Sequence, residues 1–256
     1  MGTAVARTAP VGLKEYKRKR RFDVTPEPSG EEKRPAAKRP AAKRPAAKRR
    51  KALGYVIQKH RATALHYDFR LEWKGVLLSW AVPKGPSLDP SVKRMAMPTE
   101  DHPIAYAAFE GIIPEGEYGG GTVMIWDEGT WAPESEDVDA ALKRGDLKFS
   151  LNGKKLKGSW VLVRLRPRSG ESRAGWLLIK HRDEHATKED IAETQPRSVV
   201  SNRILVEIAR DEGGNMEKAA TGDPAGLLRK LAKNPKLLTP PRKGRKAVWH
   251  SNRASS

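Results

Sequence analysis

The sequence predicts a mainly β domain, built as a barrel or a sandwich, with a basic arm before it and a C-terminal extension after it. Residues 65–72 alternate strictly between apolar and polar side chains, which is the period of a strand with one buried face. Lys74-Gly75 follows and leads into the apolar residues 76–82, which predicts a hairpin. Several further short β-like segments are separated by turn residues, a pattern typical of barrels and sandwiches.

The elements are expected in the following order. Strands should cover residues 54–58, 65–72, 76–82, 94–99, 122–127, 146–151, 158–166 and 175–180. Asn152-Gly153 predicts a tight turn between two of them. Helical patterns are sparse, and helices are expected over residues 137–144, 188–193, 203–210 and 225–232. We therefore expect a basic, disordered arm over residues 1–52, a β domain over 53–184, and an extension over 185–256 that is partly helical or disordered.

Positive charge is concentrated near the N-terminus. The 256 residues hold 50 Lys and Arg against 31 Asp and Glu, a net charge of +19. Residues 1–51 hold 17 against 5, a net of +12, and the remainder has a net of +7. Such a field favours polyanions, of which nucleic acid is the usual intracellular one. The alternative is a solubilising tail without a dedicated partner.

A five-residue repeat lies inside this arm. Pro35-Ala-Ala-Lys-Arg39 recurs twice, over residues 40–44 and 45–49. Proline at every fifth position disfavours a helix, so we expect an extended, self-repelling linker. Its Lys-Arg pairs are suited to neutralising phosphates without reading base sequence.

The composition excludes several classes of protein. The chain has no cysteine, which rules out disulfides, thiolate metal sites, iron–sulfur clusters and a cysteine nucleophile. No apolar run is long enough to span a membrane, and residues 1–14 lack the apolar core of a secretory signal. We expect a cytoplasmic, nucleoid-associated protein with no membrane partner.

A candidate metal site lies on the polar face of the predicted strand 65–72. His66 and Asp68 are two residues apart on that face, and His60 can fold back toward them across residues 61–64. Two imidazoles and one carboxylate suit manganese, zinc or iron and leave coordination positions open. The alternative is an ordinary polar face on an exposed strand.

Further polar residues complete the inventory of a phosphate site. Arg70 extends the same face and can grip a phosphate with two hydrogen bonds. Lys84 lies on a Pro/Gly turn, and residues 100–103 place Glu100 and His102 at a strand end; both features are also common on plain surfaces. The glycine-rich residues 116–121 lack the Lys-Ser/Thr of a phosphate loop and have no following helix, so we expect a hairpin turn there.

Longer strings resemble the 3′-phosphoesterase domain of bacterial DNA ligase D. The strings are Val56-Ile-Gln-Lys-His60, Leu65-His-Tyr-Asp-Phe-Arg-Leu-Glu72, Ser79-Trp-Ala-Val-Pro-Lys-Gly-Pro-Ser87, Glu100-Asp-His-Pro103 and Trp126-Asp-Glu-Gly-Thr-Trp131. The resemblance runs from Leu53 to about Arg182 and includes residues 20–28 upstream. It implies a closed or nearly closed β-barrel with a substrate groove on one side.

The resemblance also implies an activity and its residues. Family members remove a 3′-terminal ribonucleotide and then the 3′-phosphate from DNA, using Mn²⁺, in nonhomologous end joining; Co²⁺ or Zn²⁺ are alternative ions. The implied metal ligands are His60, His66 and Asp68. The implied catalytic residues are Arg70, His102, Tyr106, Lys84, Glu100, Arg94 and Gln58, and the implied substrate-binding residues are Arg20, Glu27, Arg70 and Lys84. Arg21 departs from the family, which has an acidic residue there.

The expected partners are DNA with 3′-ribonucleotide or 3′-phosphate ends and a separate DNA ligase, polymerase or end-binding protein, since the chain resembles a stand-alone version of the domain. The rival hypothesis is a non-catalytic DNA-binding or scaffold module of a repair complex. The basic arm supports that rival, but a pure binder does not need the set His60, His66, Asp68, Arg70 and His102.

Overall fold

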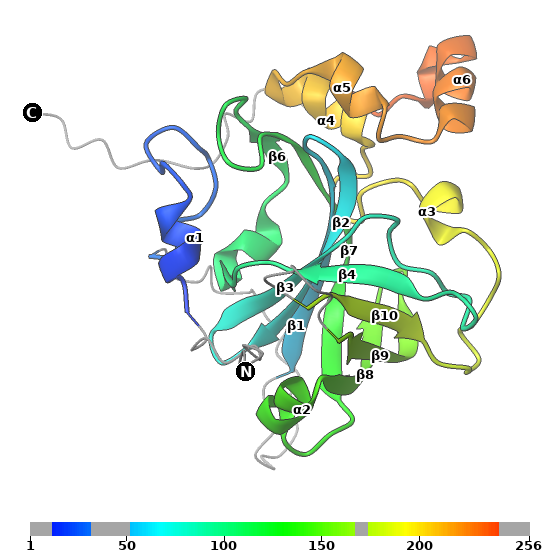
Figure 1. Cartoon of the computed structure of the whole chain (residues 1–256). Helices are drawn as coiled ribbons and strands as arrows, with labels where there is room; N and C mark the ends of the chain where they lie inside the picture. The colour runs from blue at the N-terminus through cyan, green and yellow to red at the C-terminus, as the bar shows by residue number, and fades with distance from the viewer. Residues whose placement is uncertain (1–11, 32–51, 167–173, 241–256) are drawn as a thin grey trace, which may run out of the picture.

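The computed structural model describes residues 12–31, 52–166 and 174–240 (Figure 1). The Pro-Ala-Ala-Lys-Arg repeats and the basic tail after Pro240 lie outside these residues. The neighbouring strands of the main sheet are, in spatial order, β1 (Leu53–Arg61), β2 (Leu65–Trp73), β3 (Val76–Val82), β4 (Arg94–Pro98), β10 (Trp176–Lys180), β9 (Lys157–Arg164), β8 (Asp146–Gly153) and β7 (Gly121–Pro133). Because β7 also pairs with β1, the eight antiparallel strands close into a barrel. The short strands β5 (His102–Pro103) and β6 (Gly111–Ile113) pair with β3 and β7. This confirms the predicted β-barrel.

Strand β1 is longer than the predicted strand 54–58. It continues through Arg61, and His60 is the direct cross-strand partner of His66 on β2. The sequence pattern did not predict residues 59–61 as part of the strand because Lys59 and His60 are polar and interrupt the apolar run. In the structure the two side chains alternate, so that Lys59 follows the core face of Ile57 while His60 follows the outer face.

The turn between β8 and β9 lies two residues later than predicted. Asn152 and Gly153 belong to the end of β8, and the chain turns at residues 154–156. A Cβ at Gly153 would overlap the Tyr55 hydroxyl. The glycine is therefore explained by close approach of a neighbouring side chain and not by turn geometry.

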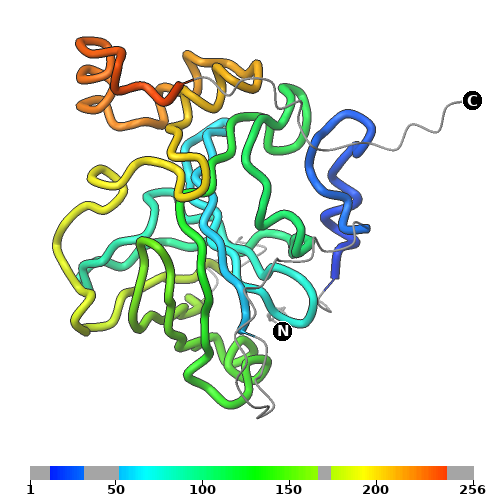
Figure 2. The backbone as a smooth tube through the Cα atoms, turned by 180° about the vertical axis from the view of Figure 1, so that it is seen from behind, coloured from blue at the N-terminus to red at the C-terminus, as the bar shows by residue number. Residues whose placement is uncertain are grey.

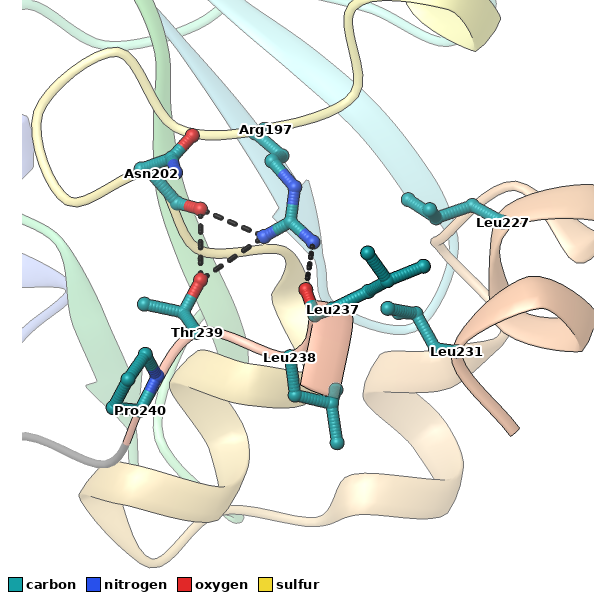
Figure 3. A pocket seen from close by; sticks show the side chains of 8 residues that line it. All are labelled: Arg197, Asn202, Leu227, Leu231, Leu237, Leu238, Thr239 and Pro240. Atoms are coloured by element: carbon teal, nitrogen blue, oxygen red, sulfur yellow. Dashed lines mark hydrogen bonds between the residues drawn. The ribbon is translucent and has the colours of Figure 1, made fainter. Parts of the chain in front are cut away.

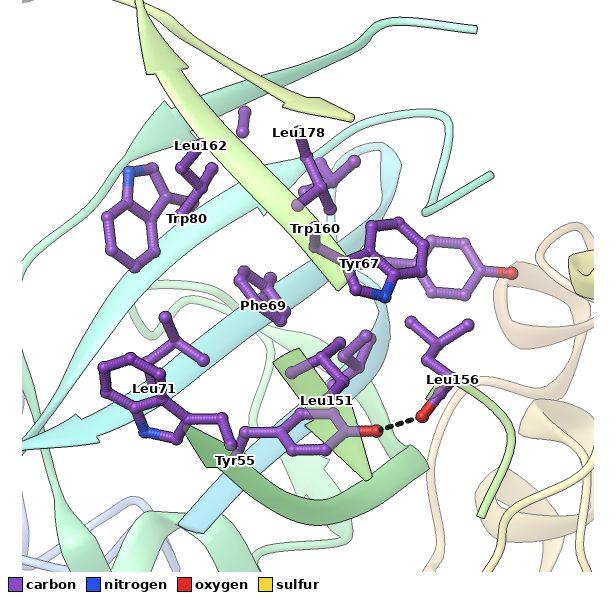
Figure 4. Packing of buried hydrophobic residues seen from close by; sticks show 14 of the residues in the cluster. Tyr55, Tyr67, Phe69, Leu71, Trp80, Leu151, Leu156, Trp160, Leu162 and Leu178 are labelled. Atoms are coloured by element: carbon purple, nitrogen blue, oxygen red, sulfur yellow. Dashed lines mark hydrogen bonds between the residues drawn. The ribbon is translucent and has the colours of Figure 1, made fainter. Parts of the chain in front are cut away.

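The core fills the barrel with aromatic and branched aliphatic side chains (Figure 4). Phe69 stacks on Phe149 at a centroid distance of 5.8 Å, and Trp80 meets Trp176 edge to face at 6.1 Å. Buried aromatic rings contribute the largest apolar areas of any side chains. These pairs therefore stabilise the packing of β2 and β3 against β8 and β10 inside the barrel.

Six short α-helices and two 3₁₀ helices accompany the barrel in the described residues. They are α1 (Lys14–Arg18), η1 (Ile104–Ala108), α2 (Val138–Arg144), α3 (Ile191–Thr194), α4 (Leu205–Glu212), α5 (Met216–Ala220), α6 (Ala225–Lys233) and η2 (Pro235–Leu237). The Asp137 side chain accepts a 2.9 Å hydrogen bond from the Ala140 amide and caps α2. No helix among the described residues has the length and apolar character needed to cross a bilayer.

The C-terminal helices α4, α5 and α6 gather at one end of the barrel (Figures 1 and 2). Leu205 and Ile208 of α4 belong to the barrel's own hydrophobic core. The buried Arg203 lies 3.3 Å from both Glu110 and Asp211. These contacts tie the C-terminal helices to the segment between η1 and β6.

Part of the N-terminal arm is folded. Helix α1 and the following loop, up to Glu31, lie beside the η1–β6 segment (Figures 1 and 2). Tyr16 is fully buried there, and its hydroxyl donates a 2.6 Å hydrogen bond to the Pro28 carbonyl. The charge of residues 1–52 predicts an arm without structure, but residues 12–31 carry enough buried aromatic surface to dock.

Candidate functional site

Three predicted ligands converge on the outer wall of the barrel. The β1–β2 register places His60 opposite His66, and Asp68 follows two residues later on the same face. His60 Nδ1 lies 3.5 Å from Asp68 Oδ2, and His66 Nε2 lies 3.6 Å from the same oxygen. One ligand atom from each residue can be chosen so that all three lie within 4.8 Å of one another. The cluster can therefore hold a metal ion.

The chemistry of the three donors fits a divalent transition metal. The second ring nitrogen of each imidazole faces a backbone carbonyl: His60 Nε2 is 2.8 Å from Gly119 O, and His66 Nδ1 is 3.1 Å from Ala64 O. A carbonyl only accepts, so these nitrogens carry the protons and the opposite lone pairs face Asp68. Backbone acceptors of this kind orient metal-ligating histidines, and a cation between the lone pairs and the carboxylate would relieve their repulsion.

The electrostatics keep Asp68 ionised. Burial opposes the charge, but the Arg70 guanidinium, 3.1 Å from the carboxylate, outweighs burial and holds the pKa of Asp68 well below its usual range. Burial lowers the pKa of His66, but the hydrogen bond that the protonated ring can donate to Asp68, together with the Asp68 charge, outweighs burial and raises that pKa. A carboxylate that stays charged is a competent metal ligand.

Arg70 is held rigidly beside the cluster. Its Nε donates to Gln58 Oε1 at 2.8 Å, Nη1 to Ser79 Oγ at 2.9 Å, and Nη2 to Asp68 Oδ2 at 3.1 Å. Gln58 in turn donates to the carbonyls of Tyr106 and Phe109 at 3.0 and 2.9 Å. Since a guanidinium has five N–H donors, these three contacts do not use all of them.

His102 lies between two guanidinium groups. Its Nδ1 is 2.8 Å from Glu100 O and 2.9 Å from Arg70 Nη1, and its Nε2 is 3.2 Å from Arg20 Nη2. Because a carbonyl only accepts, we assign the proton to Nδ1, which leaves Nε2 to accept from Arg20. Burial, Arg70 and Arg20 together hold the pKa of His102 well below its usual range, so the ring is neutral at physiological pH.

The folded arm forms one wall of the site. Arg20 Nε donates to Glu27 Oε1 at 2.8 Å, and Arg20 Nη1 donates to Glu100 Oε1 at 3.0 Å. The Tyr106 hydroxyl also donates to Glu27 Oε1, at 3.0 Å. The side chains of Arg20, Glu27 and Glu100 are almost fully buried. Residues of the arm, β5 and η1 therefore form one hydrogen-bonded network with the site.

A pocket of about 290 Å³ connects these groups. Its lining includes His60, His66, Asp68, Arg70, His102 and Tyr106, together with Arg20 and Glu100. Gln58 and Glu27 lie behind this wall and hold lining residues in place. Neither Lys84 nor Arg94 lines the pocket. Lys84 is exposed on the turn after β3, and Arg94 lies on the core face of β4 with Ala96, so their roles stay predictions.

Two of the pocket residues that the sequence pattern did not predict lie next to each other in one turn. Tyr118 and Gly119 both line the pocket, and the Gly119 carbonyl orients His60. They lie in the glycine-rich turn that joins β6 to β7, so the predicted hairpin is confirmed. A tyrosine within such a turn was the available signal.

A second pocket, of about 440 Å³, lies among the C-terminal helices and is lined by leucines and Arg197 (Figure 3). Arg197 Nη1 donates to Asn202 O at 2.8 Å and Glu207 Oε2 at 3.0 Å, and Nη2 donates to Leu237 O at 3.3 Å. Its donors serve the packing of these helices. The pocket at the barrel wall is therefore the candidate site.

The fold and the site define an antiparallel β-barrel protein with a His-His-Asp cluster that can hold a metal ion, in a pocket that is also lined by two arginines. Residues 58–164 match the family model described as the DNA Ligase D 3′-phosphoesterase domain. The barrel of this chain belongs to that family.

Curated relatives agree with the family match. The chain is 47% identical over 197 residues to a multifunctional non-homologous end joining protein LigD of Pseudomonas aeruginosa, which covers 76% of this chain and 22% of the relative. It is 50% identical over 110 residues to a LigD DNA repair protein of Mycobacterium tuberculosis, covering 43% of this chain and 14% of the relative. The chain thus spans about a fifth or less of the length of these relatives.

Proposed function

We propose that this protein is a metal-dependent hydrolase of phosphoester bonds at the 3′ ends of DNA in nonhomologous end joining. It removes a 3′-terminal ribonucleotide by releasing its nucleoside, which leaves a 3′-phosphate, and then hydrolyses that phosphate. The observation that carries the proposal is the convergence of His60, His66 and Asp68 beside Arg70 in one pocket. Membership in the 3′-phosphoesterase family and relatives named for end joining support the same reaction class.

The proposed metal is Mn²⁺, held by His60, His66 and Asp68, with Co²⁺ or Zn²⁺ as alternatives. When bound, it would polarise a phosphate oxygen and activate water. These side chains suit the role of metal ligands. Asp68 stays ionised, and backbone carbonyls orient the imidazoles of His60 and His66.

The chain's own cations would stabilise the charge that grows on the phosphate. Arg70 and Arg20 both line the pocket, and fixed donors in a buried site stabilise developing charge without reorganisation. A neutral His102 that donates to Glu100 O and accepts from Arg20 is suited to holding Arg20 at the pocket wall. We therefore propose that His102 positions Arg20 and does not act as the proton donor.

A labelled primer–template ending in one ribonucleotide tests this function. In Mn²⁺ we expect a primer shortened by one nucleotide with a 3′-phosphate, followed by a 3′-hydroxyl product. Chelator should remove both products because it removes the metal. If intact protein yields neither product in Mn²⁺, Co²⁺ or Zn²⁺, the hydrolase assignment fails and the scaffold alternative is favoured.

The basic segment 33–51 is proposed to bind DNA without sequence preference. It holds ten Lys and Arg and no acidic residue. Each neutralised phosphate adds about −0.9 to the slope of log affinity against log salt. Deleting the segment should therefore weaken duplex binding and flatten this slope, measured by fluorescence anisotropy at several salt concentrations. A control of equal length with the ten cations replaced by Gln should behave as the deletion does; an unchanged slope in both contradicts the assignment.

A further inference from the structure

Tyr118 presents an exposed aromatic ring in the wall of the pocket. Its exposed fraction is 49%, although it lines the same pocket as His60, His66 and Asp68. A half-exposed ring contributes little to the packing of the fold. We propose that Tyr118 binds the substrate by stacking on the nucleobase of the 3′-terminal nucleotide, an inference that rests on the proposed function.

The turn that carries Tyr118 is fixed to the metal cluster on one side. The carbonyl of the next residue, Gly119, accepts the 2.8 Å hydrogen bond from His60. Gly119 has φ +82, and a Cβ there would lie 3.5 Å from His60 Cε1. The turn therefore follows the imidazole closely, and the Tyr118 ring lines the same pocket as the cluster.

The folded arm fixes the turn on its other side. Lys19 Nζ donates to the Tyr118 hydroxyl at 3.2 Å and lies 4.6 Å from the ring centroid. The ring is thereby held in place before substrate arrives, and an aromatic ring beside a cation is a suitable platform for a base.

The shape of the site indicates which base reaches this ring. On the Tyr118 side the arm closes the pocket through Arg20 and Glu100. The pocket wall also includes Ala81, whose cross-strand partner Met97 is 38% exposed. A duplex needs an unobstructed approach to the pocket, so we assign the side that the arm closes to the one nucleoside beyond the scissile phosphate.

This placement separates the two reactions of the proposed function. A 3′-ribonucleotide end has a terminal nucleoside that can stack on Tyr118, whereas a 3′-phosphate end has none. Tyr118 should therefore determine the efficiency of ribonucleotide removal and leave phosphate removal unchanged. Because stacking does not depend on base identity, all four terminal bases should benefit.

The test compares Tyr118→Ala with Tyr118→Phe on both ends in Mn²⁺. We expect Tyr118→Ala to lower kcat/KM for ribonucleotide removal about 5- to 100-fold, with the phosphate-removal rate within about twofold of the unmodified protein, and Tyr118→Phe to retain both. Met216→Ala, which removes a side chain of similar exposure (46%) on α5, is the matched control. Equal loss on both ends, or no loss on either, overturns the inference.

A substrate with an abasic terminal ribose supplies a second readout. The unmodified protein should process it as slowly as Tyr118→Ala processes the normal end, and Tyr118→Ala should no longer distinguish the two ends. In chelator, a terminal 2-aminopurine should be quenched by the unmodified protein and not by Tyr118→Ala. If the unmodified protein removes neither the ribonucleotide nor the phosphate, the proposed function fails. If it removes both, but Tyr118→Ala distinguishes normal from abasic ends as well as the unmodified protein does, only the stacking inference fails.

Discussion

Replacing His60 or His66 with alanine should abolish 3′-end processing and leave DNA binding nearly intact. Either change removes one of three donors whose ligand atoms lie within 4.8 Å of one another, so the metal would lose a third of its protein ligands. Duplex affinity depends instead on cations that neutralise phosphates. We expect no product from a ribonucleotide-ended primer and a duplex Kd within about twofold of the unmodified protein.

The matched control for these variants is His185→Ala. His185 is exposed, pairs at 3.7 Å with Glu184, and does not line the pocket. The His185→Ala protein should process 3′ ends at the rate of the unmodified protein. Full activity of either cluster variant, or full activity of the unmodified protein in chelator, would show that the cluster does not carry the reaction.

Replacing Arg20 with alanine should have the second largest effect. Arg20 forms ion pairs with Glu27 and Glu100 and contacts His102. Its guanidinium carbon also lies 4.0 Å from the centroid of the Tyr16 ring. Its loss leaves the buried Glu27 carboxylate without its cation, which typically costs about 3–5 kcal/mol. Loss of a fixed donor from a catalytic pocket typically lowers kcat by about 10²–10³. Urea unfolding and the primer assay measure the two effects.

The adjacent Arg21 offers a control of the same residue type. Its side chain is 68% exposed and pairs only with Glu117 among the contacts described for it. The Glu117 side chain is 7% exposed, but Arg21 itself lies largely in solvent, where ion pairs are weak. Arg21→Ala should therefore remain much closer to normal than Arg20→Ala in both assays. Equal effects of the two substitutions would contradict the special role of Arg20. The comparison also addresses the position at which this sequence departs from its family.

The fold was predictable where one period dominates the sequence. Residues 65–72 alternate cleanly, and β2 has the expected inner and outer faces. Prediction failed where tertiary contacts override local signals. Lys59 interrupts the apolar pattern of β1, Gly153 serves a close approach to Tyr55, and Tyr16 anchors a segment whose charge suggests disorder.

The site was predictable to the extent that its residues share one strand face. His66, Asp68 and Arg70 follow from the alternation of β2, and the β1–β2 hairpin brings His60 opposite them. Arg20 and Glu27 come together with His102 only because the arm docks on the barrel, although Arg20 and His102 are about 80 residues apart in the sequence. Only the family resemblance indicated that these residues act together. Tyr118 was missed because its turn has no strand or helix period.

Locating a bound metal tests the central claim most directly. Crystals of the full chain soaked in Mn²⁺ can be measured at a wavelength where manganese scatters anomalously. The account predicts one strong anomalous peak within bonding distance of His60 Nδ1, His66 Nε2 and the Asp68 carboxylate. A protein that processes 3′ ends at the same Mn²⁺ concentration, but shows its manganese elsewhere or none at this cluster, would contradict the assignment of the pocket.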